Sequence, residues 1–233
     1  MKRCGLLALS LPALFTLALT GCGSTYYVYK ENLSLLFSSS EKAPLSWQAI
    51  TASQFDLIAV DTGSNSGTMA LAFLEHQQHK FIGADNSFLI LQHGRIVRSS
   101  GFDNDLLHHS VTDKFPVNDD PLSIASHTMA TQLAGSSWQY TQLNKDGNTL
   151  LCKTLWSEGV LTSLQVLGAN FSVLYFAEQI TVTDGSQFTN EFWFSTDGKT
   201  LLKTKQFIAP GSAPLDIVFL SRLNRLRTET GML

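Results

Sequence analysis

The stretch that decides the fold is residues 171–208, which read FSVLYFAEQITVTDGSQFTNEFWFSTDGKTLLKTKQFI. Two Asp-Gly pairs, Asp184-Gly185 and Asp197-Gly198, interrupt runs of β-branched and aromatic residues. Asp-Gly is typical of tight turns between antiparallel strands, because glycine accepts a positive φ. The stretch therefore predicts three consecutive antiparallel strands, over Phe171–Thr183, Gln187–Ser195 and Lys199–Ile208.

The middle strand of the three also predicts how the sheet is buried. Phe188, Phe192 and Phe194 occupy alternate positions, whereas the positions between them include polar residues. Successive side chains of a strand point to opposite faces, so this alternation indicates one buried face and one wet face.

The same pattern of short apolar or alternating runs separated by turn residues extends from about Gln54 to the C-terminal end. His93-Gly94 predicts a two-residue hairpin turn between Ser87–Gln92 and Arg95–Ser99, and Asp146-Gly147 predicts another between Trp138–Leu143 and Thr149–Trp156. Four further apolar runs read as strands or strand-like segments: 55–60, 68–74, 160–167 and 215–223. Residues 102–121 hold several Asp residues and two prolines, and they predict an irregular crossover.

About ten strands with one or two short helices predict an all-β fold with minor α content. Its architecture is either one large, strongly curved antiparallel sheet or two packed sheets, half-barrel or sandwich-like. The one helix suggested within the lead-in is an amphipathic stretch over residues 26–37.

The first 22 residues are typical of a secretion signal. Lys2 and Arg3 precede an uncharged apolar run over residues 4–19, and Leu19-Thr20-Gly21-Cys22 looks like a bacterial lipobox. A run of about 16 residues is shorter than the roughly 20 that a membrane-spanning helix needs. We therefore expect cleavage before Cys22 and lipidation of its thiol, which gives stable anchoring when two or more acyl chains are attached.

This signal also predicts compartment and domain boundaries. Gly23 stands where aspartate is the usual signal for retention in the inner membrane, so an outer-membrane location facing the periplasm is expected. We expect a signal peptide over residues 1–21, a lipid-anchored tether and lead-in over 22–50, and a single β-rich domain over 51–233.

Charge and cysteine content limit the function classes. Removing the positive charges of Lys2 and Arg3 takes the formal net charge from −3 to −5, which argues against nucleic acid and against a polybasic membrane patch. With Cys22 lipidated, only Cys152 remains, so no disulfide is expected. Its apolar neighbours Leu150 and Leu151 predict a buried hydrophobe.

Few residues match a catalytic or metal-binding pattern. Asp61-Thr62-Gly63 matches the active-site string of aspartic proteases, but that chemistry needs two carboxylates and the sequence holds a single copy. A strand that ends in an ordinary turn, with Asp61 capping its own loop, also explains the string. His76 and His79 have the spacing of metal ligands on a helical turn, and His108-His109 lies among carboxylates. Both pairs lack a third ligand and read as solvated loop histidines. We expect no catalytic residues, no metal and no cofactor.

The hairpin at His93-Gly94 carries the candidate ligand-binding residues. Arg95 and Arg98 follow the turn, and Asp103 and Asp105 come soon after, so an Arg-carboxylate pair beside a loop is expected. As a surface ion pair it contributes at most about 1 kcal/mol to stability. As a polar cluster, Arg95, Arg98 and Asp105 would bind an anionic or hydroxylated ligand such as a sugar.

Residues 89–102, LILQHGRIVRSSGF, followed by Asp105-Leu106, resemble the YjbF-type or group 4 capsule polysaccharide lipoproteins. So do Asn190–Phe194, Gly198, residues 203–206 and Pro210. Phe81 departs from the tryptophan expected before the hairpin. The resemblance covers essentially the whole chain and implies a periplasm-facing outer-membrane lipoprotein that acts beside machinery for polysaccharide production or export.

These observations favour a non-enzymatic accessory factor for exopolysaccharide or capsule secretion, which binds glycan or an export protein. Two alternatives stay open. One is a lipid-binding or acyl-chain-binding carrier built from a curved sheet, and the other is an aspartic protease that uses Asp61-Thr62-Gly63.

Overall fold

The computed structural model describes residues 45–111, 120–208 and 210–231. The predicted helix over residues 26–37, the signal peptide and Cys22 lie outside the described residues. The main compact unit runs from Ala43 to Leu233. Its described strands are β1 Leu57–Asp61, β2 Ser66–Glu75, β3 Gln78–Gly83, β4 Phe88–Gln92, β5 Arg95–Ser100, β6 Leu106–Val111, β7 Ser137–Asn144, β8 Thr149–Trp156, β9 Val160–Val166, β10 Ala169–Val182, β11 Gln187–Ser195, β12 Leu201–Gln206 and β13 Leu215–Val218.

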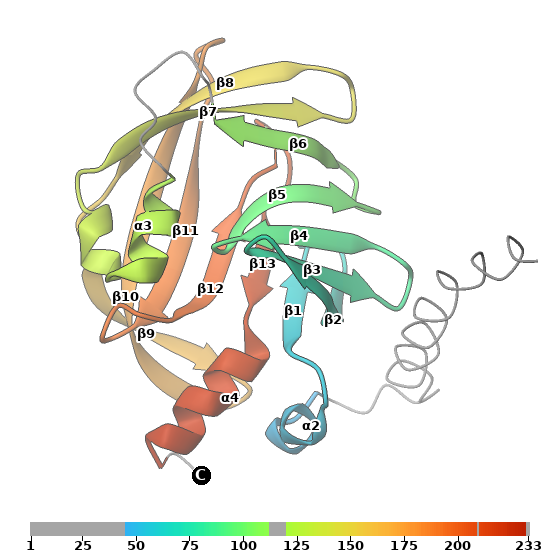
Figure 1. Cartoon of the computed structure of the whole chain (residues 1–233), viewed down its shortest axis with the longest axis vertical. Helices are drawn as coiled ribbons and strands as arrows, with labels where there is room; N and C mark the ends of the chain where they lie inside the picture. Colours follow the sequence, from blue (N-terminus) through green and yellow to red (C-terminus); the bar gives the residue numbers. More distant parts are fainter. Residues whose placement is uncertain (1–44, 112–119, 209, 232–233) are drawn as a thin grey trace, which may run out of the picture. The chain divides into compact units, whose positions relative to one another are not determined.

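All of these strands join one antiparallel sheet. The order is β5-β4-β3-β2-β1-β13-β12-β11-β10-β8-β7-β6, and β9 pairs with β10 off this path. The two ends of the order, β5 and β6, lie side by side, so the sheet curls into a nearly closed barrel (Figure 1). The all-β prediction with a strongly curved antiparallel sheet is confirmed. The described residues form more strands than the ten expected, because β3 and β6 had not been recognised as strands.

Side chains join the sheet where β5 meets β6. The backbone N–H of Leu106 donates to Ser99 Oγ at 2.8 Å, and Ser99 Oγ donates to Asp105 Oδ1 at 3.1 Å. Asp105 also accepts the backbone N–H groups of Gly101 and Phe102. The carboxylate of Asp105 therefore holds the β5–β6 connection in a tight turn.

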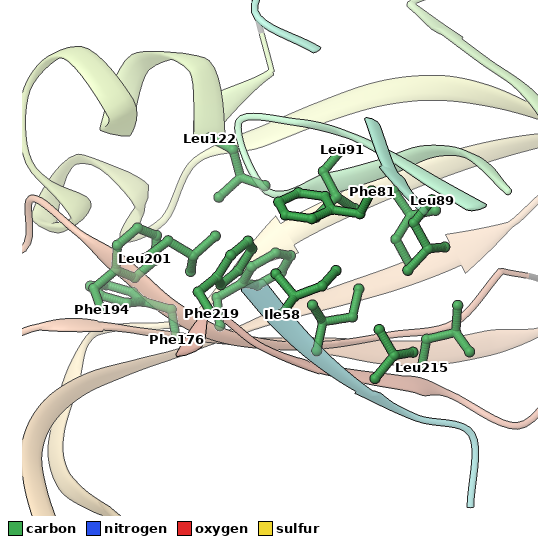
Figure 2. Close-up of a cluster of buried hydrophobic side chains, with 14 of the residues drawn as sticks. Ile58, Phe81, Leu89, Leu91, Leu122, Phe176, Phe194, Leu201, Leu215 and Phe219 are labelled. Carbon is green, nitrogen blue, oxygen red and sulfur yellow. The ribbon is translucent and has the colours of Figure 1, made fainter. Parts of the chain in front are cut away.

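The inner face of the sheet holds the main core. Aromatic and aliphatic side chains from β1, β3, β4, β10, β11 and β13 converge there, and Figure 2 shows how they meet. Phe192 and Phe194 of β11 point inward, whereas Trp193 packs in a separate cluster on the other face. The predicted alternation along β11 is confirmed, and it places large apolar side chains inside the barrel.

Two helices cover part of the outer face. These are α2, Trp47–Ala52, and α4, Leu220–Glu229. Trp47 packs against Phe171 at a ring-centroid distance of 6.0 Å, and Leu223 belongs to the same cluster. Residues 215–223 were expected as one closing run, but the strand ends at Val218 and α4 begins at Leu220. The helical spacing of Leu220, Leu223 and Leu226 explains this change.

The segment predicted as an irregular crossover over residues 102–121 contains β6. It then leads to α3, Pro121–His127, and the 3-10 helix η1, Ala130–Leu133. Asp120 caps α3 by accepting the backbone N–H of Leu122 at 3.0 Å. Leu122 and Ala125 of α3 enter the core cluster, so α3 packs against the interior of the barrel. No helix in the described ranges combines the length and apolar character needed to cross a membrane.

Candidate functional site

A buried ionic cluster is centred on Arg95, at the first position of β5. Arg95 Nε donates to Asp120 Oδ2 at 2.6 Å, and Nη2 donates to Asp120 Oδ1 at 3.1 Å. Nη1 and Nη2 also donate to the two oxygens of Glu178, at 2.8 Å each. The side chains of Arg95 and Glu178 are 3% and 0% exposed, so this ion pair lies inside the protein rather than on its surface.

Further groups complete the cluster. Glu178 accepts Trp138 Nε1 at 3.0 Å and Asn190 Nδ2 at 3.1 Å. The guanidinium of Arg95 stacks over the rings of Trp138 at 4.7 Å and Tyr140 at 5.5 Å. Burial by itself lowers the pKa of Arg95, but the two carboxylates outweigh burial and raise this pKa well above its usual value. Arg95 is therefore held permanently charged.

The turn before Arg95 is fixed from the opposite side of the barrel. His93 and Gly94 both have positive φ, 52° and 93°, which matches the predicted two-residue hairpin turn. Gln206 of β12 donates to the carbonyl of Gly94 at 2.7 Å and accepts the N–H of Ile96 at 3.1 Å. The hairpin is confirmed, and Gln206 positions the backbone on both sides of Arg95.

The structure does not bring the three predicted ligand-binding residues together. Arg95 is buried, and four of its N–H groups are engaged by Asp120 and Glu178. Arg98 is exposed, and Asp105 lies beyond the other end of β5, where it caps a turn. A role of these residues in ligand binding stays a prediction.

The expected surface pairing of Arg95 with a nearby aspartate is wrong. Its carboxylate partners lie 25 and 83 residues away in sequence, because the closed sheet brings β10 and the start of α3 to the beginning of β5. Sequence reasoning missed Glu178. The available signal was a glutamate at an inward position of β10, between Phe176 and Ile180, since a buried glutamate requires a partner.

The histidine predictions need correction. His76 and Gln77 have positive φ and form the turn between β2 and β3, so His76 and His79 do not share a helical turn. His109 is not a solvated loop residue, because it lies in β6 and stacks on Tyr140 at 4.4 Å. Burial, together with the charge of Arg95, lowers the pKa of His109 well below 6.5, so it is neutral at pH 7. Within the described ranges, no three His, Cys, Asp or Glu side chains form a group that could hold a metal ion.

Asp61 caps its own turn, as the alternative to a protease active site predicted. Its Oδ1 accepts the N–H of Gly63 at 2.6 Å at the end of β1, and its side chain is exposed. Asp216 lies opposite Asp61 in the sheet register, but Lys203 pairs with Asp216 at 2.7 Å. Protease chemistry needs two carboxylates that share one proton. Asp61 and Asp216 do not fit that role, because the ammonium group of Lys203 pairs with Asp216.

Cys152 is a buried thiol, as predicted. It is 0% exposed and packs with Trp138, Tyr140 and Ile180. Burial raises the pKa of Cys152 to about 11, so the thiol is protonated at neutral pH. A protonated thiol is a poor nucleophile.

A cleft of about 480 Å³ opens beside the β4–β5 turn. Its walls come from the β2–β3 hairpin, α3, the β11–β12 turn and α4. Its polar lining is basic or neutral: Gln77, His79, His93, Ser126, His127, Lys199, Thr200 and Arg222. Apolar side chains, among them Leu122, Phe194 and Leu201, complete the lining. Sequence reasoning missed this site because its residues come from five separate segments.

Comparison with known proteins places this architecture in a family. The family model described as group 4 capsule polysaccharide lipoprotein gfcB, YjbF, matches residues 30–220. The chain belongs to this family. The resemblance found in the hairpin block and in the strand at Asn190–Phe194 is thereby confirmed.

This YjbF-family chain is also similar to two proteins of Escherichia coli K12. The chain is 22% identical to the uncharacterized lipoprotein GfcB of Escherichia coli K12 over 213 residues, which cover 89% of this chain and 95% of that protein. Its structure is similar to the crystal structure of the hypothetical lipoprotein YmcC from Escherichia coli K12. That likeness has a TM-score of 0.69 and 21% identity, covers 82% of this chain and 94% of the other, and shows a shared fold.

Proposed function

We propose that this YjbF-family protein is an outer-membrane lipoprotein, anchored through Cys22, that serves as a non-enzymatic accessory factor in exopolysaccharide or capsule secretion. The observation that carries the proposal is the family match over residues 30–220, whose description names capsule polysaccharide. The lipobox ending at Cys22 supports the anchor, and Gly23 supports the outer membrane. In this proposal the domain faces the periplasm and binds glycan or an export protein.

The chemistry of the described residues supports an accessory role rather than catalysis. The protease-like string forms a turn at Asp61, the buried thiol of Cys152 is protonated, and the carboxylates around Arg95 are engaged in ion pairs. The inner face of the sheet is occupied by packed side chains (Figure 2). That packing offers the acyl-carrier alternative no specific support.

Deletion of the gene tests the proposal, in cells grown under conditions in which the neighbouring polysaccharide genes are expressed. We expect the deletion to reduce surface polysaccharide, and a plasmid copy of the wild-type gene to restore it. A Cys22→Ala copy should fail to restore it although the protein is produced, because the unlipidated chain is not anchored. Surface polysaccharide that is unchanged by the deletion would contradict the proposal.

A further inference from the structure

The cleft beside the β4–β5 turn has an unusual charge for this protein. Its lining includes the ammonium group of Lys199, the guanidinium of Arg222 and three histidines, and none of its described lining residues is Asp or Glu. The chain as a whole carries more acidic than basic residues. A concave region lined by one sign of charge concentrates its field and attracts ligands of the opposite sign.

Arg222 is the residue that points most directly to a ligand. One of its N–H groups donates to the carbonyl of Leu201 at 3.0 Å, and its guanidinium stacks on Phe219 at 4.1 Å. In the part of the chain that the structure describes, no carboxylate lies within ion-pair distance of it. Burial lowers the pKa of Arg222 to about 10, so it remains charged at pH 7. The carboxylate of Asp56, which is paired with Arg225 at 2.8 Å, offsets only part of this desolvation, and a bound anion would offset it further.

Arg95 shows how differently this chain treats an arginine that serves the fold. That guanidinium is enclosed by two carboxylates, whereas Arg222 faces an open cleft together with other basic groups. Arg95 is 2% exposed and Arg222 is only partly buried, and their surroundings are opposite. The first is a structural ion pair, and the second has the surroundings of an anion site.

The remaining lining suits a sugar that carries the anionic group. Thr200 offers a hydroxyl and Gln77 offers an amide, both of which can hydrogen-bond to sugar hydroxyl groups, whereas the Ser126 hydroxyl is engaged by Ser123 O and His93 Nδ1. Leu122 is directed from α3 toward the core cluster, and Leu201 and Phe194 lie nearby (Figure 2). These three side chains are buried, whereas Leu74 of the same lining is 66% exposed and can pack against the C–H face of a sugar ring while the basic groups contact the oxyanion.

We infer that the cleft lined by Lys199, Arg222 and the three histidines binds an acidic glycan through an oxyanion, either a uronate carboxylate or a phosphate ester. This inference rests on the proposed function, because that function supplies the reason for a glycan to reach the domain. It adds the location of the site and the charge of the sugar.

Calorimetric titration of the full-length, detergent-solubilised lipoprotein tests the inference. The probes are a galacturonic acid hexamer, glucose 6-phosphate and, as the neutral control, maltohexaose. Binding of the hexamer or of the sugar phosphate, at least about tenfold tighter than that of maltohexaose, is expected and identifies which oxyanion is preferred. Equal binding of maltohexaose, or binding of none of the three, would overturn the inference.

Variants place the binding in the cleft. Lys199→Gln and Arg222→Gln should each weaken binding of the acidic probe by about tenfold, the expected effect of losing one charge-assisted hydrogen bond. Lys199 is exposed, so its variant keeps the test valid even when Arg222→Gln fails to fold. Lys153→Gln, an exposed lysine on β8 outside the cleft, is the matched control and should bind like the wild type. Unchanged binding by Lys199→Gln would overturn the inference.

This test is independent of the genetic one. If the purified protein binds the acidic probe but surface polysaccharide does not depend on the gene, the proposed function is refuted and the cleft assignment stands. A gene that is needed for polysaccharide but encodes a protein without acidic-glycan binding would refute only the cleft assignment.

Discussion

At the scale of single residues, the contrast between Arg95 and Arg98 shows what sequence patterns can reveal. The two arginines lie three positions apart and look equivalent in sequence, but one is enclosed by carboxylates and the other is exposed. The partners of Arg95 come from β10 and from the residue that caps α3, so only the closed sheet reveals them. The turn and the importance of Arg95 could be predicted from the sequence, but the carboxylates that pair with Arg95 could not.

This contrast predicts the effect of two matched substitutions. Arg95→Met should lower the free energy of unfolding by about 3–5 kcal/mol, because it leaves two carboxylates without their cation. Arg98→Met should change it by less than about 0.5 kcal/mol, as is usual for an exposed site. Urea unfolding followed by tryptophan fluorescence measures both values. Similar losses in the two variants would contradict the structural role of Arg95.

A second residue-scale prediction concerns acid and His109. Burial holds the pKa of His109 well below its unfolded value of 6.5, so below pH 6.5 the unfolded chain binds a proton that the folded chain does not. Stability should therefore fall as the pH drops from 6.5 toward the folded pKa. His109→Phe, which keeps the stacking on Tyr140, should lessen this loss when unfolding is measured at pH 7.5 and 5. An identical pH dependence in the variant would rule out His109 as a source of acid sensitivity.

At the scale of elements, strands that end in a short turn were predicted well. The boundaries of β8 and β11 match the sequence expectation, because Asp-Gly pairs and alternating burial are local signals. β6 and α4 were missed for different reasons. A crossover rich in Asp hid β6, and the apolar run of β13 continued without interruption into the first turn of α4.

Gly94 in the β4–β5 turn can be compared with Gly147 in the β7–β8 turn to test the close packing around Gly94. A Cβ on Gly94 would lie 2.1 Å from Leu201 Cδ2, whereas a Cβ on Gly147 meets nothing within 4 Å, although both glycines have positive φ. Gly94→Ala should therefore cost about 1–3 kcal/mol more stability than Gly147→Ala, the usual penalty of overpacking. Urea midpoints of the two variants give the difference, and equal midpoints would contradict the close approach of Leu201.

The closure between β5 and β6 makes a further prediction. Ser99→Ala removes the acceptor of the buried Leu106 N–H and should cost about 1–3 kcal/mol. The neighbouring Ser100→Ala serves as the control. Amide hydrogen exchange should become faster at Leu106 in the first variant, and unchanged protection there would show that the closure does not depend on Ser99.

At the scale of the whole molecule, the histidines of the cleft connect anion binding to pH. Burial lowers the pKa values of His79 and His93. The charge of Arg222 further lowers the pKa of His79. For His93, nearby Asp120 partly raises the pKa and the charge of His127 lowers it. Asp56 likewise partly raises the pKa of His79, whereas the charge of His93 lowers it. Both histidines are therefore mostly neutral at pH 7.

A bound anion favours the protonated histidines, so the affinity for the galacturonic acid hexamer should rise as the pH falls from 7.5 to 5. The double variant His79→Gln, His93→Asn should bind with an affinity that changes much less over this range. Asparagine is chosen at position 93 because it tolerates positive φ. Wild-type affinity that stays constant with pH would exclude a histidine contribution to the cleft.

A basic cleft on a nearly closed barrel is thus the proposed link between this chain and the capsule polysaccharide for which its family is named. The measurement that tests this link most directly is surface polysaccharide in the deletion strain, complemented with either the wild-type gene or the Lys199→Gln, Arg222→Gln double variant. We expect the wild type to restore the polysaccharide and the double variant, produced and anchored at the same level, not to restore it. Full restoration by the double variant would contradict the proposed link.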